Sequence, residues 1–382
     1  MLLKQTLARW AAVWTLGVGV MLALPQAAWA QDIVIGQVGP FTGIPVPDAP
    51  EVNQGLKAWA NQVNKAGGIN GRKVVVFEID DTYKPDGFVS ALERAMQRQP
   101  VALISPIGSA SIQRMLNDKL LDKYDVVFMN AIPGAEPFRN PGHPRLFHVR
   151  AGDKQQLEEI VKHASTLGMT RLAVLHQEIP IGTSGMKVVA DEVAKNKGLE
   201  VKGVQGTLDP AVLAKAAEDV ARLNAQGVIV VGAPPFMAQG VAQLRKAGVT
   251  QTIFVLSYVP PGLLVKLAGA DGARGIGIAQ TYPNPNNKVR PLLRDFQSAM
   301  KATSPEVSSY TPFQLEGYIS ARIVGEGLRR IRGEITPAAL AKSLQSMGEI
   351  ELGGFRVDFS RGNVGSSFVD IAVVDQEGRL RY

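Results

Sequence analysis

Short apolar runs alternate with segments of helical periodicity along the first part of the chain. The apolar runs predict strands at residues 33–38, 73–79, 101–104 and 126–129. Helical spacing predicts helices at 51–65, at 85–97 and from about 109 to 122, and Leu56, Trp59 and Val63 share one face of the first of these. Regular alternation of strand and helix predicts a parallel sheet with helices on both faces.

A second series of the same kind follows and predicts a second α/β lobe. Its helices are expected at 154–167, 183–196, 210–224 and 237–247, and its strands at 172–175, 200–204, 228–231, 252–256 and 275–279. Three more helices, at 288–302, 313–330 and 337–346, precede strand-like pieces at 355–359 and 368–374. We expect these late helices to return to the first lobe. A cleft between two such lobes is a usual place for a small-molecule site.

The stretch from Ala102 to Gln113 is the first candidate for chemistry. It reads as a buried strand, a turn of small residues at Gly108, and a helix that opens at Ser109 or Ser111. Free N–H groups and the dipole at a helix start attract a carboxylate. The alternative is an ordinary strand-to-helix turn in which a serine caps the helix.

Residues 1–30 have the pattern of a secretory signal peptide. Lys4 and Arg9 give a positive start, residues 10–24 are apolar, and Ala28-Trp29-Ala30 is a cleavage motif before Gln31. The alternative is an N-terminal membrane anchor, for which the apolar run is short. The chain contains no cysteine, which excludes disulfides, thiolate chemistry and a lipid-bearing cysteine at the mature N-terminus.

The charge is moderately basic and dispersed. The net charge of the chain is +7, and loss of residues 1–30 removes Lys4 and Arg9 and no acid, which leaves +5. The densest basic group, Arg329, Arg330 and Arg332, lies at the end of a predicted helix, where arginine suits the negative helix end. No aromatic residues interleave with it, so we expect no nucleic-acid partner.

Catalytic and cofactor motifs are weak. The sequence Gly182-Thr183-Ser184-Gly185 is one residue short of a nucleophile elbow, and the four histidines show no metal-binding spacing. The glycine-rich residues 272–277 precede a strand rather than open a helix, which disfavours a dinucleotide site. We expect neither catalysis nor a cofactor.

Four motifs resemble a known family. They are the opening strand and loop Ile35 to Gly43, the turn Asn64-Lys65-Ala66-Gly67-Gly68-Ile69-Asn70-Gly71-Arg72, the strand end Asp80-Asp81 followed by Pro85, and the helix segment Leu315 to Ala321. In this order they resemble the branched-chain amino acid (Leu/Ile/Val-binding) family of periplasmic substrate-binding proteins of ABC transporters.

The resemblance implies a type I periplasmic-binding fold, in which two Rossmann-like lobes are joined by a three-segment hinge. The expected limits are 31–150 plus 282–352 for the N-terminal lobe and 151–281 plus 353–382 for the C-terminal lobe, with crossovers near Arg150, Thr281 and Gly353. Ligand would bind in the cleft, the lobes would close, and the closed form would dock on permease subunits at the inner membrane. We expect a periplasmic monomer with no catalytic step.

The resemblance also implies ligand contacts, residue by residue. A serine-rich loop that holds the ligand carboxylate falls on Gly108, Ser109, Ala110 and Ser111. A second loop falls on Ala131, Gly134 and Ala135, with alanine at 135 where the family has threonine. Contacts from the other lobe fall on Ile181, Gly182, Pro234 and Phe236. The acid that pairs with a ligand ammonium falls on Tyr258, and an aromatic at the mouth falls near Asp48.

These departures bear on the ligand class. A buried ammonium without a carboxylate partner is costly, and Tyr258 cannot supply the charge. Asp48 would supply it only if its loop folded inward, whereas a loop aspartate is usually solvated. We therefore expect an apolar or aromatic carboxylate without an ammonium group. Binding of branched-chain or other amino acids is the alternative, as is a sensor subunit that docks on a signalling receptor.

Overall fold

Two separate parallel sheets organise the chain, which the computed structural model describes over residues 31–43 and 48–382. The expected signal segment at 1–30 lies outside the described residues. The first sheet has the order β2-β1-β3-β4-β5, and all its strand pairs are parallel. Its strands are β1 (Ile33–Gly39), β2 (Val74–Asp80), β3 (Ala102–Ile104), β4 (Val127–Met129) and β5 (Leu146–Phe147).

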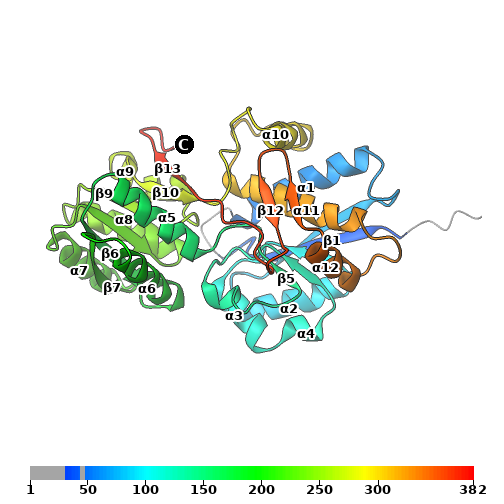
Figure 1. Cartoon of the computed structure of the whole chain (residues 1–382), viewed down its shortest axis with the longest axis horizontal. Helices are drawn as coiled ribbons and strands as arrows, with labels where there is room; N and C mark the ends of the chain where they lie inside the picture. The colour runs from blue at the N-terminus through cyan, green and yellow to red at the C-terminus, as the bar shows by residue number, and fades with distance from the viewer. Residues whose placement is uncertain (1–30, 44–47) are drawn as a thin grey trace, which may run out of the picture. The chain divides into compact units, whose positions relative to one another are not determined.

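The second sheet has the order β14-β13-β10-β9-β8-β6-β7. Its parallel part runs from β6 to β10, and two antiparallel strands from the end of the chain extend one edge. The strands are β6 (Arg171–Gln177), β7 (Glu200–Gly206), β8 (Gly227–Val231), β9 (Thr252–Val255), β10 (Gly277–Gln280), β13 (Asp370–Val374) and β14 (Leu380–Arg381). In Figure 1 the two sheets form separate groups.

Helices cover both sheets, as the alternating pattern predicts. Those that follow first-sheet strands are α1 (Asp48–Lys65), α2 (Pro85–Met96), α3 (Ser109–Asn117), α4 (Leu120–Lys123) and the short 3-10 helix η1 (Glu136–Phe138). Those around the second sheet are α5 (Asp153–Thr166), α6 (Pro180–Ala194), α7 (Pro210–Ala221), α8 (Pro234–Lys246) and α9 (Pro261–Ala273).

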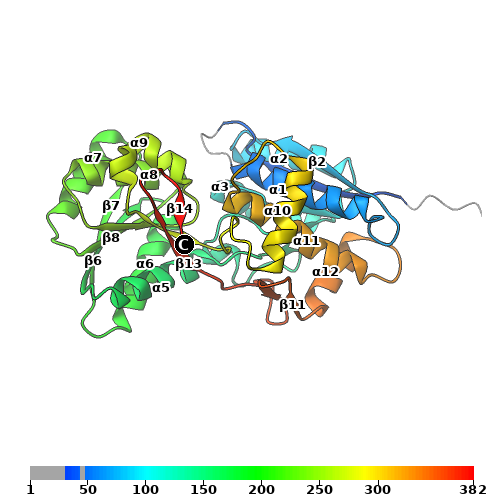
Figure 2. The ribbon, with the colours of Figure 1, turned by 90° about the horizontal axis from the view of Figure 1, so that it is seen from above.

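The late helices α10 (Pro291–Thr303), α11 (Pro312–Arg329) and α12 (Pro337–Ser346) return to the first sheet. Figure 2 shows α10 and α11 beside α1. Helices α1 and α11 meet closely at Gly55 and Gly317, where a side chain would collide with the backbone of the other helix. We call the first sheet with α1–α4 and α10–α12 the first lobe, and the second sheet with α5–α9 the second lobe. The residue limits given above for the lobes stay a prediction.

A hairpin of β11 (Glu349–Glu351) and β12 (Arg356–Asp358) precedes the final passage to the second sheet. Phe359 packs edge-on against Phe147 of β5, with ring centroids 5.2 Å apart. The chain then runs beside His148 before it reaches β13. The backbone N–H of His148 donates to the Asn363 carbonyl oxygen at 2.7 Å. The predicted strand pieces at 355–359 and 368–374 are shorter than expected.

The sequence predictions differ from the structure in several details: helices α6 and α8 begin three residues earlier than expected, and β5, β11 and β14 were not predicted. Helix α9 was not predicted, because Leu263, Leu264 and Val265 are contiguous and leave no helical stripe. The helix expected from about 109 to 122 is two helices, since Lys119 between them has φ 52°. Helix α1 begins at Asp48 rather than at residue 51. Among the described residues, none of the helices has the length and apolar character needed to cross a membrane.

Candidate functional site

The turn after β3 leads directly into α3. Gly108 occupies the N-cap position with φ 102°, a conformation that favours glycine, and the helix begins at Ser109. No side-chain hydrogen bond caps this helix, so the alternative in which a serine caps it is wrong. The N–H groups of a first turn have no acceptor within their own helix, and the helix dipole favours an anion at this end.

A hollow of about 40 Å³ opens beside this turn, at the carboxyl ends of strands from both sheets. In open α/β sheets, ligands bind at this end of the strands. The first lobe lines the hollow with residues that follow β1 to β4, and the second lobe lines it with residues that follow β6, β8 and β9. In chain order they are Asp48, Tyr83, Ile107, Gly108, Ser109, Ile132, Pro133, Ile181, Ala233, Pro234 and Tyr258.

The lining includes part of the set of ligand contacts predicted from sequence. Six predicted residues line the hollow, namely Asp48, Gly108, Ser109, Ile181, Pro234 and Tyr258. Ala110 and Ser111 belong to the first turn of α3 and do not line it. As ligand contacts, all of these residues stay predictions.

The other five predicted contacts, Ala131, Gly134, Ala135, Gly182 and Phe236, lie behind the lining. Ala131 and Ala135 belong to the apolar core of the first lobe. Phe236 is fully buried in the core of the second lobe. Gly182 lies so close to the Gln177 backbone that a Cβ would collide with it. All five residues are small or apolar, as is typical of a packed core. In the conformation described, this favours a packing role over direct contact with a ligand.

The stretch from Ala102 to Gln113 contains Ile107, and the second loop implied by the resemblance contains Pro133. As individual ligand contacts, sequence reasoning missed Tyr83, Ile107, Ile132, Pro133 and Ala233. The last four are apolar residues next to predicted ones. They follow strand ends, and that position was the available signal.

Tyr83 is presented by a loop that two aspartates shape. Asp80 Oδ1 accepts the N–H of Thr82 at 2.9 Å and that of Thr42 at 3.2 Å. Asp81 Oδ1 accepts the N–H of Tyr83 at 2.8 Å. Thr82 and Tyr83 both have positive φ, at 53° and 57°, and these bonds hold the loop in that conformation. The Asp80-Asp81 pair at the end of β2 was therefore the sequence signal that could have identified Tyr83, two residues further on.

Asp48 is buried and lines the hollow, with 3% of its surface exposed. Its interpretation as a solvated loop residue is wrong, because α1 begins at this position and buries it. Asp48 Oδ1 accepts no hydrogen bond from the residues that the structure describes. Burial raises the pKa of Asp48 to about 8, and the negative charge of Glu51 adds to the shift.

Tyr258 is fixed by two ionisable residues, Asp153 and Arg150. Its hydroxyl donates to Asp153 Oδ1 at the start of α5, and its ring lies under the Arg150 guanidinium at 4.8 Å. Gly134 permits this arrangement, since a Cβ there would lie 2.5 Å from the Tyr258 hydroxyl. Tyr258 therefore presents a preorganised aromatic wall to the hollow.

A buried ion pair lies behind that wall. Arg150 Nη1 lies 3.3 Å from Glu316 Oε1 of α11, and both side chains are almost fully buried. Asn130 Nδ2 donates to the same carboxylate oxygen at 2.8 Å, and Asn130 Oδ1 accepts the N–H of Arg150 at 2.9 Å. Arg150 Nη2 donates to Ser257 Oγ of the second lobe. One guanidinium thus contacts both lobes near the first predicted crossover.

A wider hollow of about 530 Å³ begins one helical turn further along α1. Glu51 lines it together with Ser257, Tyr310 and the end of the chain at Tyr382. Glu51 Oε2 accepts a hydrogen bond from the Thr311 hydroxyl at 2.7 Å, and burial raises the pKa of Glu51 to about 7. Asp48 and Glu51 therefore bring two acids of one helix to two neighbouring hollows.

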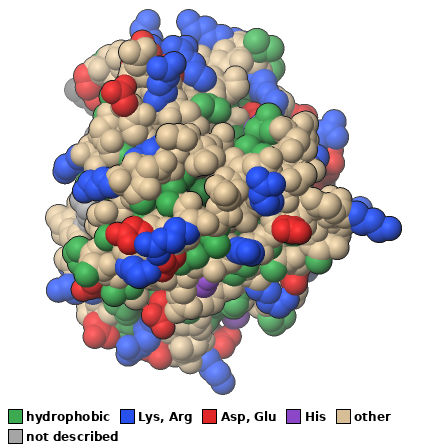
Figure 3. All heavy atoms as spheres, turned by 90° about the vertical axis from the view of Figure 1, so that its left-hand side faces the viewer, with side chains coloured by type: hydrophobic (Ala, Val, Ile, Leu, Met, Phe, Trp, Pro, Cys, Tyr) green, Lys and Arg blue, Asp and Glu red, His purple; other side chains and the backbone are tan. Residues whose placement is uncertain are grey.

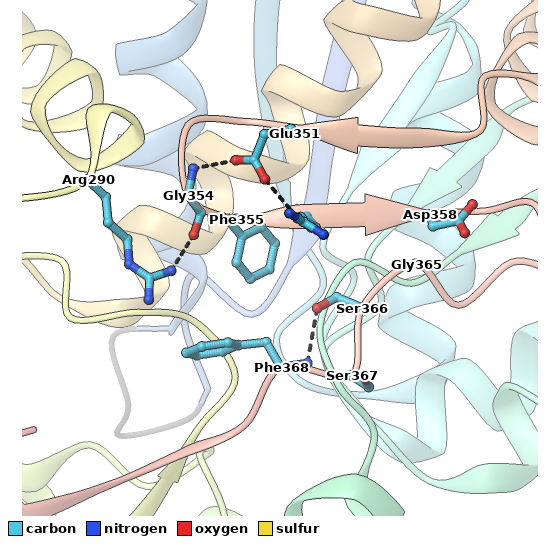
Figure 4. Close-up of a pocket in the computed structure, with 10 residues that line it drawn as sticks. Arg290, Glu351, Gly354, Phe355, Asp358, Gly365, Ser366, Ser367 and Phe368 are labelled. Atoms are coloured by element: carbon cyan, nitrogen blue, oxygen red, sulfur yellow. Dashed lines mark hydrogen bonds and ion pairs between the residues drawn. The ribbon is translucent and has the colours of Figure 1, made fainter.

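Another hollow, of about 560 Å³, is built by the β11–β12 hairpin and residues 365–368 (Figure 4). Several of its charged groups are bonded within the hairpin or to the hairpin backbone. Glu351 accepts the Gly353 N–H at 2.9 Å and an Arg356 N–H at 3.1 Å, and Arg290 donates to the Gly354 carbonyl. These bonds give the hairpin its shape.

The surface charge is mixed on the side of the second lobe that Figure 3 displays. Lys and Arg side chains are scattered there among Asp and Glu side chains. Several such charges pair along one helix, including Lys187 with Asp191 and Lys215 with Asp219, both at 2.6 Å. This face offers no broad field of one sign of the kind that nucleic-acid binding uses.

Residues 32–378 match the family model described as periplasmic binding protein. The chain belongs to this family. The match spans both lobes, and the resemblance drawn from the four motifs is confirmed together with the two-lobe α/β fold. Members are binding proteins, and this periplasmic binding protein is not an enzyme.

Two solved structures are similar over most of this periplasmic binding protein. An extracellular ligand-binding receptor from Verminephrobacter eiseniae is 54% identical, with a TM-score of 0.87, over 92% of this chain and 100% of that one. A substrate-binding periplasmic protein from Ralstonia solanacearum is 26% identical, with a TM-score of 0.81, over 91% and 99%. Among curated proteins, the Leu/Ile/Val-binding protein homolog 3 of Brucella melitensis is 24% identical, over 92% of this chain and 93% of its own length.

Proposed function

We propose that this protein captures a small ligand in the cleft between its lobes and delivers it to an ABC transporter permease at the inner membrane. The observation that carries the proposal is the start of α3, which opens on a hollow lined by both lobes. The name of the Brucella relative supports ligands of the amino acid type.

The ligand is a small carboxylate with an apolar body. Its carboxylate lies on the N–H groups of the first turn of α3, where the Ser109 hydroxyl adds a hydrogen bond. Its body contacts Ile181, Pro234 and the Tyr258 ring, which are apolar surfaces of the second lobe. The 40 Å³ hollow is smaller than such a ligand, so the lobes open by the hinge to admit it and close over it.

Replacing Ser109 by alanine is expected to weaken binding by about ten-fold or more, because a hydrogen bond to a charged group contributes about 1.5–3 kcal/mol. A thermal-shift screen of amino acids and of aromatic and aliphatic carboxylates selects the ligand, and isothermal titration measures its Kd. Ser298→Ala, on an exposed part of α10, is the matched control and should leave Kd unchanged. Equal affinity of wild type and Ser109→Ala would contradict the carboxylate position.

Export with cleavage after Ala30 is expected, because residues 1–30 have the signal pattern described above. Mass spectrometry of the periplasmic fraction of an expressing Gram-negative host should find a mature chain that begins at Gln31. A chain that keeps Met1 and stays in the membrane fraction would overturn this prediction.

A further inference from the structure

Asp48 is a buried acid in the lining of the hollow, and one of its two carboxyl oxygens has no hydrogen-bond partner among the described residues. It lines the hollow next to Ser109 and Tyr83, and its Oδ1 accepts no hydrogen bond within the described part of the chain. A buried carboxyl group without a partner is costly, and such a group is tolerated where a ligand completes its bonds. The expectation of an ammonium-free ligand had two premises, the missing acid at Tyr258 and an exposed Asp48, and the second is wrong.

The charges around Asp48 determine which kind of ligand group can bond to its unpartnered oxygen. The described lining residues include this one carboxyl group and no Lys, Arg or His. Of the charged groups nearby, Arg150 is already bonded to Glu316 and Ser257, and Glu51 adds negative charge from the same helix. Tyr83 and Tyr258 face the hollow as neutral phenols whose pKa values burial raises. When Asp48 is ionised, the described lining of the hollow therefore supplies no positive charge to balance it.

We propose that Asp48 accepts a hydrogen bond from a protonated amine of the ligand. The inference rests on the proposed function and deepens it. The cleft then takes a zwitterion, with its carboxylate on the first turn of α3 and its ammonium on Asp48. Both anchors belong to the first lobe, so the second lobe contributes the apolar wall and no ionic contact with the ligand. Specificity for the amine depends on one side chain of α1.

In this arrangement, ligand binding depends on the protonation state of Asp48. At pH 7 most of the Asp48 carboxyl groups are protonated, since the pKa of Asp48 is raised to about 8. An ammonium favours the ionised form, so binding releases a proton and affinity rises about ten-fold per pH unit from pH 6 toward pH 8. A carboxylate without an amine would show the opposite trend, because it binds best to the protonated acid and weakens above pH 8.

The test compares L-leucine with 4-methylpentanoate and L-phenylalanine with 3-phenylpropanoate by isothermal titration between pH 6 and 8.5. In each pair the two molecules differ by the amine. We expect at least one amino acid to bind more tightly than its partner, with Kd falling as pH rises. Asp48→Asn should lose about 10- to 100-fold in affinity for that amino acid and show a flatter pH profile. Any slope that remains reports Glu51, whose pKa is raised to about 7.

The matched control is Asp86→Asn, which changes an exposed aspartate in the first turn of α2. It should leave affinity and pH profile unchanged. Circular dichroism and thermal unfolding show whether Asp48→Asn stays folded. We expect equal or greater stability, because the substitution removes a buried acid without a partner.

The outcomes separate the two proposals. If the amine-free acids bind as tightly as the amino acids, or if Asp48→Asn keeps full affinity for an amino acid, the role of Asp48 is overturned and the proposed function stands. If none of the four probes binds to a folded wild-type protein, the proposed ligand class and the role of Asp48 are both overturned.

Discussion

Replacing Arg150 by methionine is expected to lower the free energy of unfolding by about 3–5 kcal/mol at pH 8. The substitution leaves Glu316 buried with no cation in contact, while Asn130 still donates to it at 2.8 Å. Removal of one partner of a buried ion pair is far more costly than loss of an exposed pair, which contributes about 0–1 kcal/mol.

The loss should depend on pH in a defined direction. Burial raises the pKa of Glu316 in the folded protein, and Arg150 opposes that shift. Without Arg150 the folded state binds the Glu316 proton more tightly than the unfolded chain does, since glutamates in unfolded chains have a pKa of about 4.3. The variant also holds this proton more tightly than wild type does, so its stability relative to wild type falls as pH rises from the Glu316 pKa of the wild-type protein toward the higher pKa of the variant. The loss should be smaller at pH 5 than at pH 8.

Urea unfolding followed by circular dichroism at pH 5 and pH 8 measures both effects. Arg329→Met removes an arginine whose ion pair with Glu326 is partly exposed, and it should cost no more than about 1 kcal/mol. If Arg150→Met unfolds within 1 kcal/mol of wild type at both pH values, the buried pair does not have the stabilising role described here.

Gly55→Ala should also destabilise the first lobe strongly, near the upper end of the range of about 1–3 kcal/mol found for overpacked cores. A Cβ at this position would collide with the Gln314 carbonyl oxygen and lie 2.8 Å from the Tyr318 backbone nitrogen. Helices α1 and α11 would have to move apart, and this cost exceeds the helix propensity that alanine adds, which is about 1 kcal/mol.

Gly262→Ala is the control for Gly55→Ala. Gly262 lies in the first turn of α9, and a Cβ there meets nothing within 4 Å. This variant should be as stable as wild type or slightly more stable. Thermal unfolding of both variants distinguishes a packing effect from a general effect of losing glycine. Equal melting temperatures for the two would rule out the close helix contact as a determinant of stability.

The alternation of strands and helices was predictable because apolar runs such as those of β1 and β8 fill buried parallel strands. β1 and β8 are short and apolar, and the structure buries both almost completely. Helix α9 was not predictable in the same way, since its apolar residues form a block and not a stripe. Its start at Pro261 was the remaining local signal.

The candidate site was predictable where one strand end determines it, as at Gly108 and Ser109. Asp48 was among the predicted site residues, but its burial was not predictable, because that burial depends on contacts with segments distant in sequence. Helix α1 is packed against α11, and Thr311 bonds to Glu51 across 260 positions of sequence. Side-chain chemistry alone suggests exposure for an aspartate, and no local pattern signals that a distant helix covers it.

The return of α10–α12 to the first sheet has a consequence for the order of folding. Tyr318 bonds to Gln62 and Thr311 to Glu51, so the core of the first lobe stays open until residues beyond 310 have been synthesised. The second lobe has its parallel strands β6 to β10 in one continuous stretch and needs no such wait. The apolar face of α1 therefore stays uncovered while most of the chain is being synthesised. In this interval, aggregation or chaperone binding competes with folding.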